Sequence, residues 1–250
     1  MTVLELYKYF NGIIPSSLSC EWDNDGLMCC PDGGHEVRRA LVCLDVTEEA
    51  VNEAIKGGFD VIVSHHPFIF KGLKSLDDEK FVSRKAMKLI KADIAVMSFH
   101  TRLDAVEGGV NDTLAKLLGI SDATPFGEGI GRIGTLSSPV SLSDFAKTVK
   151  TSLCSPTVSV ADAGKKVYRV AVLGGSGDDE IGAAIAAGAD TYVSGELGHH
   201  PMTDAPDMGI NLIEAGHFYT EEPVCEVLAE KLSSLSIEAV RFNSNRTMVI

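Results

Sequence analysis

Residues 39–64 have the sequence RALVCLDVTEEAVNEAIKGGFDVIVS, which carries the clearest signals for helix and strand in the chain. Its apolar ends, Arg39–Leu44 and Val61–Ser64, predict two buried strands. Thr47 is a good N-cap residue and acidic residues follow it, which predicts a helix from Thr47 to Lys56. A strand, a helix and a second strand in succession predict a β-α-β unit with parallel strands.

A similar stretch recurs in the second half of the chain. When residues 41–64 are laid over residues 171–194 without a gap, the identical pairs are Val42/Val172, Ala54/Ala184, Ile55/Ile185, Gly58/Gly188, Asp60/Asp190, Val63/Val193 and Ser64/Ser194. Any two β-α-β units can share small residues and a glycine turn. Here a His-x-x-x-acid motif also follows each stretch in the matching place, so we expect a duplicated unit.

Helix and strand signals alternate along both halves. The expected helices are 3–11, 47–56, 80–91, 108–118, 143–153 (capped by Ser141 or Ser143), 178–187 and 223–233, and the expected strands are 39–44, 61–64, 94–99, 167–173, 191–193 and 210–215. This pattern predicts an α/β fold made of two similar α/β halves with mainly parallel or mixed sheets. We expect the halves to span residues 1–126 and 127–250, with the strand and helix at about 210–235 packing back toward the first half.

Composition and charge narrow the class of protein. A formal net charge of −13 argues against a nucleic acid or an anionic membrane as the main partner. No apolar run approaches the roughly 20 residues that cross a bilayer. The N-terminal segment lacks the basic start of a signal peptide, so we expect a cytoplasmic protein. The six cysteines show no Cys-x-x-Cys spacing, and we expect them to be reduced thiols.

Four of the seven histidines follow predicted strands: His65 and His66, His100 with Asp104, and His217 with Glu221. Ligand sites of open α/β sheets form beyond the carboxyl ends of strands, so we expect a metal site in the cleft between the halves. The i, i+4 spacing puts histidine and carboxylate on one face if a helical turn begins at the histidine. So many donors favour two metals, although each carboxylate alone could equally cap a helix.

Four motifs stand out along the chain: Ser-His-His-Pro at 64–67, Phe-His-Thr-Arg-Leu-Asp-Ala at 99–105, Gly-Gly-Val-Asn-Asp at 108–112 and Gly-His-Phe-Tyr-Thr-Glu at 216–221. These segments resemble the Nif-three-like family, whose members are often called GTP cyclohydrolase I type 2 homologues. Residues 21–27, 170–177 and 194–196 are also similar to family segments. The resemblance covers the chain from about Met1 to about Ser233.

The resemblance implies a dinuclear metal centre and a toroidal homohexamer. The ligands it implies are His65, His66, Asp104, His217 and Glu221, which suit two divalent ions of zinc, iron or manganese. It moves His100, the candidate catalytic residue, from the ligands to the pocket, where it could act as a proton carrier or as a hydrogen-bonding partner of the ligands. Further candidate pocket residues are His200, Glu196 and Trp22.

The function that the resemblance implies is metal-dependent hydrolysis, in which activated water opens the imidazole ring of GTP and formate is released. The ligand set suits a phosphoesterase on another nucleotide-like small molecule equally well. A metal-binding regulatory or partner-binding ring protein without turnover is an alternative of another class. The chain departs from the family at Ser194-Gly195-Glu196, where Thr-Gly-Asp is common, and matches it only loosely at 241–248.

Two weaker patterns concern anions. Gly174-Gly-Ser-Gly177 follows a predicted strand, so its N–H groups could cradle a phosphate or simply form a tight turn. Arg102 and Arg132 are candidate phosphate contacts, with no supporting spacing.

Overall fold

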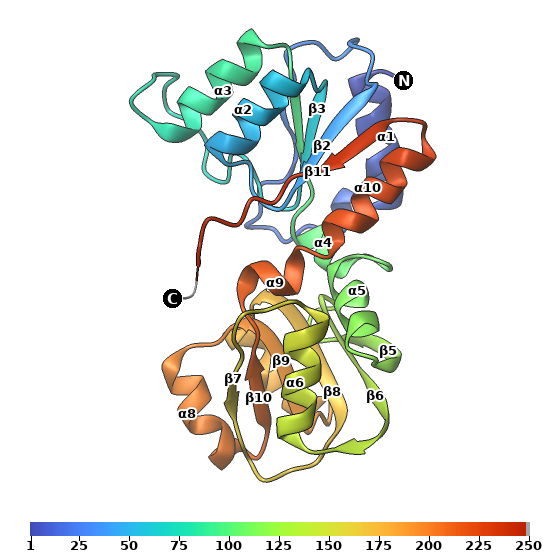
Figure 1. The fold of residues 1–250 in the computed structure, drawn as a ribbon, viewed down its shortest axis with the longest axis vertical. Helices are drawn as coiled ribbons and strands as arrows, with labels where there is room; N and C mark the ends of the chain where they lie inside the picture. Colours follow the sequence, from blue (N-terminus) through green and yellow to red (C-terminus); the bar gives the residue numbers. More distant parts are fainter. Residues whose placement is uncertain (249–250) are drawn as a thin grey trace. The chain divides into compact units, whose positions relative to one another are not determined.

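Residues 1–248 are described by the structure, a computed structural model of the chain. The chain divides into two compact units, which can be followed by colour in Figure 1. Unit 1 comprises Met1–Leu103 and Val224–Arg246, and unit 2 comprises Asp104–Pro223 together with residues 247–248. The chain leaves unit 1 within the short helix α4 (Thr101–Ala105) and re-enters it at helix α10 (Val224–Ser234).

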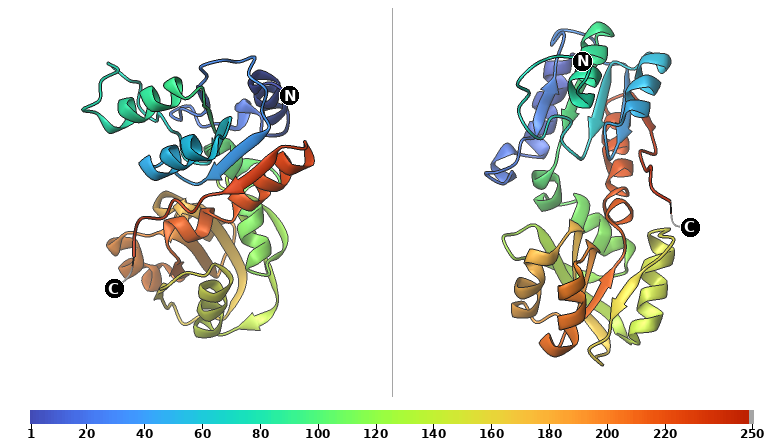
Figure 2. Two further views of the ribbon diagram at one scale, coloured as in Figure 1. Left: turned by 45° about the horizontal axis from the view of Figure 1, so that its top comes forward. Right: turned by 90° about the vertical axis from the view of Figure 1, so that its left-hand side faces the viewer.

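A mainly parallel sheet with the strand order β1-β4-β3-β2-β11 forms the middle of unit 1. Its strands are β1 (Gly26–Cys29), β2 (Arg39–Cys43), β3 (Val61–Ser64), β4 (Ala95–Ser98) and β11 (Glu238–Arg241). Only β1 runs antiparallel to its neighbour within this described sheet. Helices α2 (Glu48–Gly57) and α3 (Phe81–Lys91) cover one face, and α1 (Val3–Ile13) and α10 cover the other (Figure 2). A short 3-10 helix, η1 (Ser16–Leu18), follows α1.

The sheet of unit 2 is mixed and has the order β5-β6-β8-β9-β10-β7. Its strands are β5 (Ser121–Phe126), β6 (Gly131–Val140), β7 (Ser159–Ala161), β8 (Val167–Ser176), β9 (Thr191–Glu196) and β10 (Asn211–Glu214). Its helices are α5 (Val110–Leu117), α6 (Leu142–Ser152), η2 (Asp178–Glu180), α7 (Ile181–Ala186), α8 (His199–Met208) and α9 (His217–Glu221). Strands β8, β9 and β10 run parallel, and the other pairings are antiparallel.

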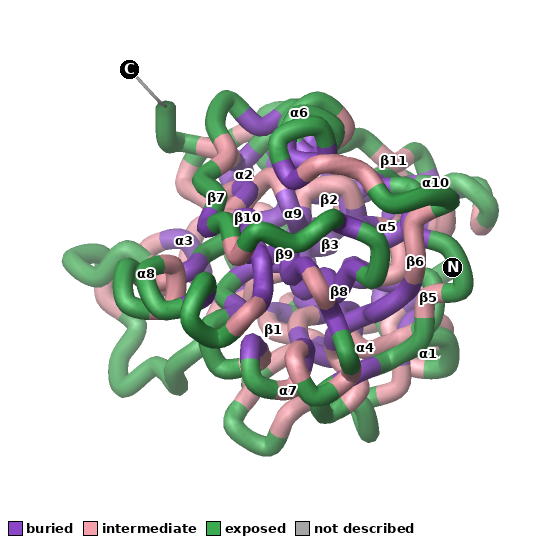
Figure 3. The backbone as a smooth tube through the Cα atoms, turned by 90° about the horizontal axis from the view of Figure 1, so that it is seen from below, coloured by how far each residue is buried: buried purple, intermediate pink, exposed green. Residues whose placement is uncertain are grey.

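Side chains alternate across this sheet and build a core on each face. Val170 and Val172 of β8 pack with helix α6, whereas Ala171 and Leu173 pack with α7 and α8. Figure 3 shows that β8 and β9 are buried over most of their length. Layers of this kind cover both faces of the parallel strands, which explains why their sequences read as continuous apolar runs.

The two units repeat the same strand register, as expected for a duplicated unit. In unit 1, Val42 of β2 pairs with Val63 of β3, and in unit 2 the corresponding Val172 pairs with Val193. An aspartate before the second strand is also used in the same way. Asp60 accepts hydrogen bonds from the backbone of residues 38 and 39, and Asp190 accepts them from residues 168 and 169.

The helices and strands predicted from the sequence are found with small shifts at their ends. Thr47 caps α2 by accepting a hydrogen bond from Ala50 N (3.1 Å), and Ser141 caps α6 through Asp144 N (3.1 Å). The mixed α/β class is therefore confirmed. Within residues 1–248, no helix has the length and apolar character needed to cross a membrane.

The division into units differs from the expected boundary between residues 126 and 127. It lies at Leu103 and Asp104, because helix α5 and strand β5 pack with β6 and β8 of unit 2. Of the segment at about 210–235, strand β10 belongs to the sheet of unit 2, and only helix α10 returns to unit 1. Strands β1, β5, β6, β7 and β11 and helix α8 were not anticipated from the sequence.

Candidate metal-binding residues

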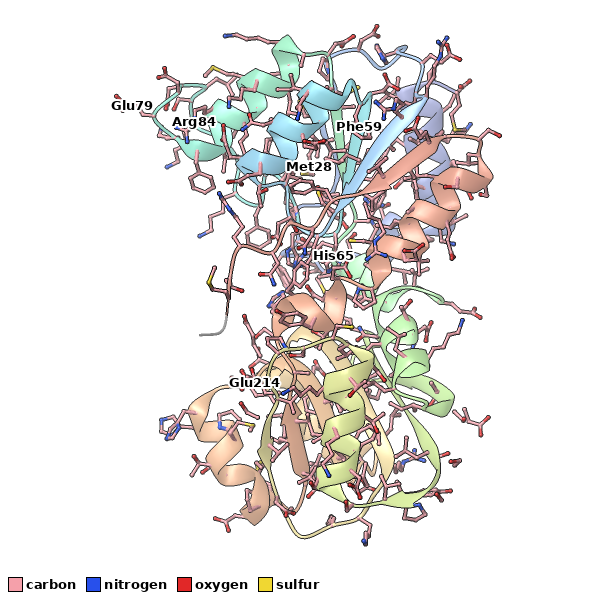
Figure 4. All side chains as sticks on the ribbon, viewed as in Figure 1. Met28, Phe59, His65, Glu79, Arg84 and Glu214 are labelled. Atoms are coloured by element: carbon pink, nitrogen blue, oxygen red, sulfur yellow. The ribbon has the colours of Figure 1, made fainter. Side chains whose placement is uncertain are left out.

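The histidines of unit 1 follow the carboxyl ends of β3 and β4. The hydroxyls of Ser64 and Ser98, 2.9 Å apart, join these two strand ends inside the core. His65 follows directly, and its backbone N–H still donates to Cys43 O of β2 (3.3 Å). Figure 4 labels His65 at this end of the sheet. The hydrogen-bonded ends of the strands thus fix the backbone positions of the histidines.

His65 and His66 are each oriented through the Nδ1 atom. Nδ1 of the buried His65 lies 2.9 Å from Phe99 O, and Nδ1 of His66 lies 2.7 Å from Asp45 Oδ1. Both oxygens are acceptors, so the ring proton sits on Nδ1 and the lone pair on Nε2. A carbonyl or carboxylate on one ring nitrogen is the usual support for an imidazole that binds metal through the other.

His100 is oriented in the same way by Asp23. Its Nδ1 lies 3.0 Å from Asp23 Oδ1, while the other oxygen of Asp23 accepts from Thr101 N (3.1 Å) and Thr101 Oγ1 (2.7 Å). Burial raises the pKa of Asp23, but the hydrogen bonds from His100 and Thr101 outweigh burial and hold this pKa well below its usual range. Asp23 is therefore an ionised acceptor that keeps the proton of His100 on Nδ1.

The three imidazoles of unit 1 form one cluster. One ring nitrogen from each of His65, His66 and His100 lies within 4.8 Å of the others. The ring centroids are 5.0 to 5.7 Å apart. Three convergent imidazole nitrogens are a donor set that divalent zinc and iron use, so these residues fit a transition-metal ion. The family resemblance placed His100 apart from the ligands, yet here it lies almost as close to His65 and His66 as they lie to each other.

Helix α9 carries the donors of unit 2. Its His217 Nε2 lies 3.0 Å from Glu221 Oε2, one turn later, and His217 Nδ1 lies 3.3 Å from Glu196 Oε1. The Glu221 side chain is only 5% exposed. A carboxylate oxygen of Asp104 lies within 4.8 Å of one from Glu221. A helical turn begins at His217, which meets the condition for the i, i+4 spacing, and unit 2 holds two buried carboxylates and an imidazole that suit a hard or borderline divalent ion.

The glycines of strand β8 form the wall behind helix α9. Gly175 has a φ of +70°, and a Cβ placed there would lie 2.2 Å from Glu221 Oε1. Its backbone N–H donates to Thr220 Oγ1 (3.1 Å), and Gly174 N donates to Asn111 Oδ1 (2.8 Å). Glycine inside a strand marks a close approach of another segment. Gly174 and Gly175 therefore allow Glu221 to lie close against strand β8, and their N–H groups are used within the protein instead of binding a phosphate.

The remaining predicted pocket residues lie in different surroundings. Glu196 contacts His217, as described above. Trp22 is 64% exposed, and its ring lies edge-to-face with His100 at 6.1 Å between centroids. His200 is exposed in the first turn of α8, with its ring against His199 at 5.5 Å. Among residues 1–248, His200 joins no group of metal-binding donors.

The two candidate phosphate-binding arginines are structural, and that prediction was wrong. Arg102 is fully buried, and its guanidinium donates to Asp25 Oδ2 (2.9 Å) and Asn11 Oδ1 (2.6 Å). Arg132 is 3% exposed and donates to Asp112 Oδ1 (2.5 Å) and to backbone carbonyl groups. Both guanidinium groups are buried and paired with acceptors of the protein, so they hold loops together.

Sequence reasoning missed the two aspartates that orient the histidines. Asp45 lies just beyond β2, so the rule that located the histidines at strand ends would also have found it. Asp23 lies in the loop before β1, and no spacing connects it with His100. Its role depends on the antiparallel pairing of β1 with β4, which brings the two loops together.

The chain was compared with known proteins. A family model described as Duf34/NIF3 (NGG1p interacting factor 3) matches residues 1–247. The GTP cyclohydrolase 1 type 2 homolog of Clostridium perfringens is 33% identical over 250 residues, which covers 97% of this chain and 95% of that protein. The protein of the same name from Nostoc sp. is 37% identical over 218 residues, with coverages of 84% and 83%. A solved hypothetical protein of Staphylococcus aureus has a TM-score of 0.90 at 30% identity, covering 100% of this chain and 99% of that one.

Proposed function

Because the chain belongs to the Duf34/NIF3 (NGG1p interacting factor 3) family, we propose that it is a dinuclear metal-dependent hydrolase. The observation that carries this proposal is the cluster of His65, His66 and His100, in which each Nδ1 is paired with an acceptor. Orienting three imidazoles at once requires a buried carbonyl and two carboxylates. An acceptor on one ring nitrogen, with ring nitrogens of all three residues converging on one point, is the usual support for imidazoles that bind metal.

The proposed ligands are the five residues that the family resemblance implies, and these are His65, His66, Asp104, His217 and Glu221. Two divalent ions held by such a set supply Lewis acidity, which activates water near neutral pH. Imidazole and carboxylate donors suit zinc, iron and manganese. In unit 2, Gly174 and Gly175 leave the space that Glu221 occupies against strand β8, and a Cβ at Gly175 would displace this carboxylate.

His100 is the proposed proton carrier. Its Nδ1–H is held by Asp23, so Nε2 is the atom that accepts a proton in the reaction and returns it to the leaving group. The ionised Asp23 also stabilises the imidazolium that forms when Nε2 takes up the proton. The names of two relatives in sequence, each called GTP cyclohydrolase 1 type 2 homolog, suggest the reaction. This reaction is hydrolytic opening of the imidazole ring of GTP with release of formate.

Metal analysis and turnover of the purified protein test this proposal together. We expect about two divalent ions per chain, and their loss in His65→Ala and in Glu221→Ala. Formate release from GTP, and phosphate release from a panel of phosphoesters, would be measured in parallel. Unchanged metal content in both variants would refute the ligand set. Full metal content without turnover of GTP or of any phosphoester would refute the hydrolase.

The His100→Ala variant separates a proton carrier from a ligand. Removing a general acid–base should lower the turnover rate by about 10²- to 10⁴-fold with the metal content unchanged. If the metal is lost instead, His100 is a third imidazole ligand of unit 1. His199→Ala is the matched control, because His199 is exposed on α8 and should affect neither measurement.

A further inference from the structure

Two exposed aromatic rings flank the histidine cluster of unit 1. Trp22 is 64% exposed and Phe70 is 46% exposed. Their centroids lie 6.2 Å apart, and each lies close to the His100 imidazole, at 6.1 and 6.4 Å. The interplanar angles of 71° to 87° show that the three rings meet edge-to-face. These two loops therefore present exposed aromatic rings beside His100.

The backbone on which the rings stand is held in place. Asp23, next to Trp22, is fixed by His100 and Thr101. Near Phe70, the side chain of Phe68 is buried, and its backbone N–H donates to Ser98 Oγ (3.2 Å). The two loops are also joined to each other, because Asn24 Nδ2 donates to Ile69 O. Binding sites need side chains that are held in place by their surroundings, and loops fixed in this way can provide them. We refer to Trp22 and Phe70 together as the aromatic wall.

The two loops are anchored by the buried side chains of Asp23 and Phe68, and not by the exposed rings of Trp22 and Phe70. The buried groups are Asp23 and Phe68, whereas the indole of Trp22 leaves most of its area in solvent. A tryptophan that served the core would bury its ring. The position of Trp22 beside His100 is explained if its face is covered by something that binds at the histidine cluster.

We propose that Trp22 and Phe70 stack against the planar heteroaromatic ring of the substrate and so select for nucleoside-like compounds. This inference rests on the proposed function for the position of the reaction, but ring binding is measurable without turnover. Aromatic side chains bind bases through their π-faces with little dependence on the identity of the base. Stacking on Trp22 and Phe70 would hold the substrate ring next to His100. Phosphate esters that lack an aromatic ring would bind less tightly.

Trp22 is the sole tryptophan of the chain, so its fluorescence reports on this wall directly. The metal-loaded, full-length protein would be titrated with guanosine, with adenosine and with ribose 5-phosphate, which has no aromatic ring. We expect quenching by both nucleosides and none by ribose 5-phosphate. In Phe70→Ala the affinity for guanosine should fall by about 5- to 150-fold, the loss of one base–aromatic contact. Phe81→Ala removes another exposed phenyl ring and should leave the affinity unchanged.

Calorimetry extends the test to Trp22→Phe, which should retain much of the affinity, and to Trp22→Ala, which should not. The proposal is overturned if neither nucleoside binds, or if both bind equally well to wild type, Phe70→Ala and Trp22→Ala. A blue shift that depends on protein concentration alone would show that a second copy covers the rings, and would also overturn it. The titration would be repeated on chelator-treated protein to distinguish the two proposals. An error in the proposed ligand set would appear in the metal content of the variants, whereas the aromatic rings of Trp22 and Phe70 would be unaffected.

Discussion

Replacing Asp23 with asparagine should move the proton of the His100 ring from Nδ1 to Nε2. The Thr101 N–H and hydroxyl both donate to one oxygen of Asp23, whereas His100 Nδ1 and the more exposed Asn24 N–H lie at the other. An asparagine therefore keeps its oxygen toward Thr101 and turns its NH₂ group toward His100. Nδ1 must then accept, and the lone pair at Nε2 is lost.

The magnitude follows from these contacts. The loss of charge weakens two hydrogen bonds from Thr101 and reverses the one from His100, so we expect Asp23→Asn to lower the free energy of unfolding by about 3 kcal/mol. Changes in residues that orient metal-binding or catalytic histidines typically cost about 10- to 100-fold in affinity or activity. The affected quantity should be turnover if His100 carries protons and metal affinity if it is a ligand.

Long-range nitrogen–proton NMR of the histidine rings distinguishes the two tautomers directly. In metal-free wild-type protein the His100 proton should be found on Nδ1, and in Asp23→Asn on Nε2. Thr101→Val is the matched control, because it perturbs Asp23 and leaves the His100 acceptor in place. An unchanged tautomer in Asp23→Asn, with normal turnover and metal binding, would contradict the role given to Asp23.

The same variant has a defined pH dependence. The folded-state pKa of Asp23 is depressed, so its contribution to stability is present above the ordinary value of 3.8 and is lost as the pH falls through the folded-state pKa. The stability gap between wild type and Asp23→Asn should therefore persist at neutral pH and narrow only in strong acid. A gap that closed near neutral pH would show that another group is responsible.

The other predictions concern the glycine wall and one surface histidine. Gly175→Ala should displace Glu221 and so lower both the stability of the protein and its affinity for metal. The control is Gly182→Ala, in helix α7 with open space around it, which should stabilise the protein by about 0.5–1 kcal/mol. If the two variants behave alike in denaturation and in metal titration, the steric argument is refuted. The hydrogen bond to Asp60 raises the pKa of His35 above its ordinary 6.5, so His35→Gln should destabilise the protein below that pH and progressively less as the pH rises through the folded-state pKa. A destabilisation independent of pH would mean that His35 acts through packing.

The sequence was sufficient where periodic apolar runs decide the structure. The β2-α2-β3 unit and its counterpart in unit 2 follow from the alternation of apolar runs and N-cap residues. Helix α8 could not be predicted, because its sequence contains Pro201 and Pro206 and buries only Ala205. Strand β5 has an exposed and mostly polar sequence, and its pairing with β6 is what makes it a strand. In both cases tertiary contacts override weak local preference.

The candidate site could be predicted from the sequence only in part. The histidines stand out because each follows an apolar run, and the topology of parallel sheets brings such positions together. Of their acceptors, Asp45 follows a predicted strand and could be found by the same rule, whereas Asp23 is an ordinary turn residue until the fold pairs it with His100. The exposure of Trp22, and its contact with Phe70, likewise depends on two loops that are distant in sequence.

Strand β11 has a consequence for synthesis on the ribosome. It completes the sheet of unit 1 by pairing in parallel with β2, for example Glu238 with Arg39. Nearly the whole chain must therefore emerge before this edge of β2 is covered, while most of unit 2 lies in one continuous segment. Unit 2 should fold first during translation, and an unfinished unit 1 should expose an apolar strand edge that attracts chaperones. Truncation before residue 224 would leave that edge open permanently.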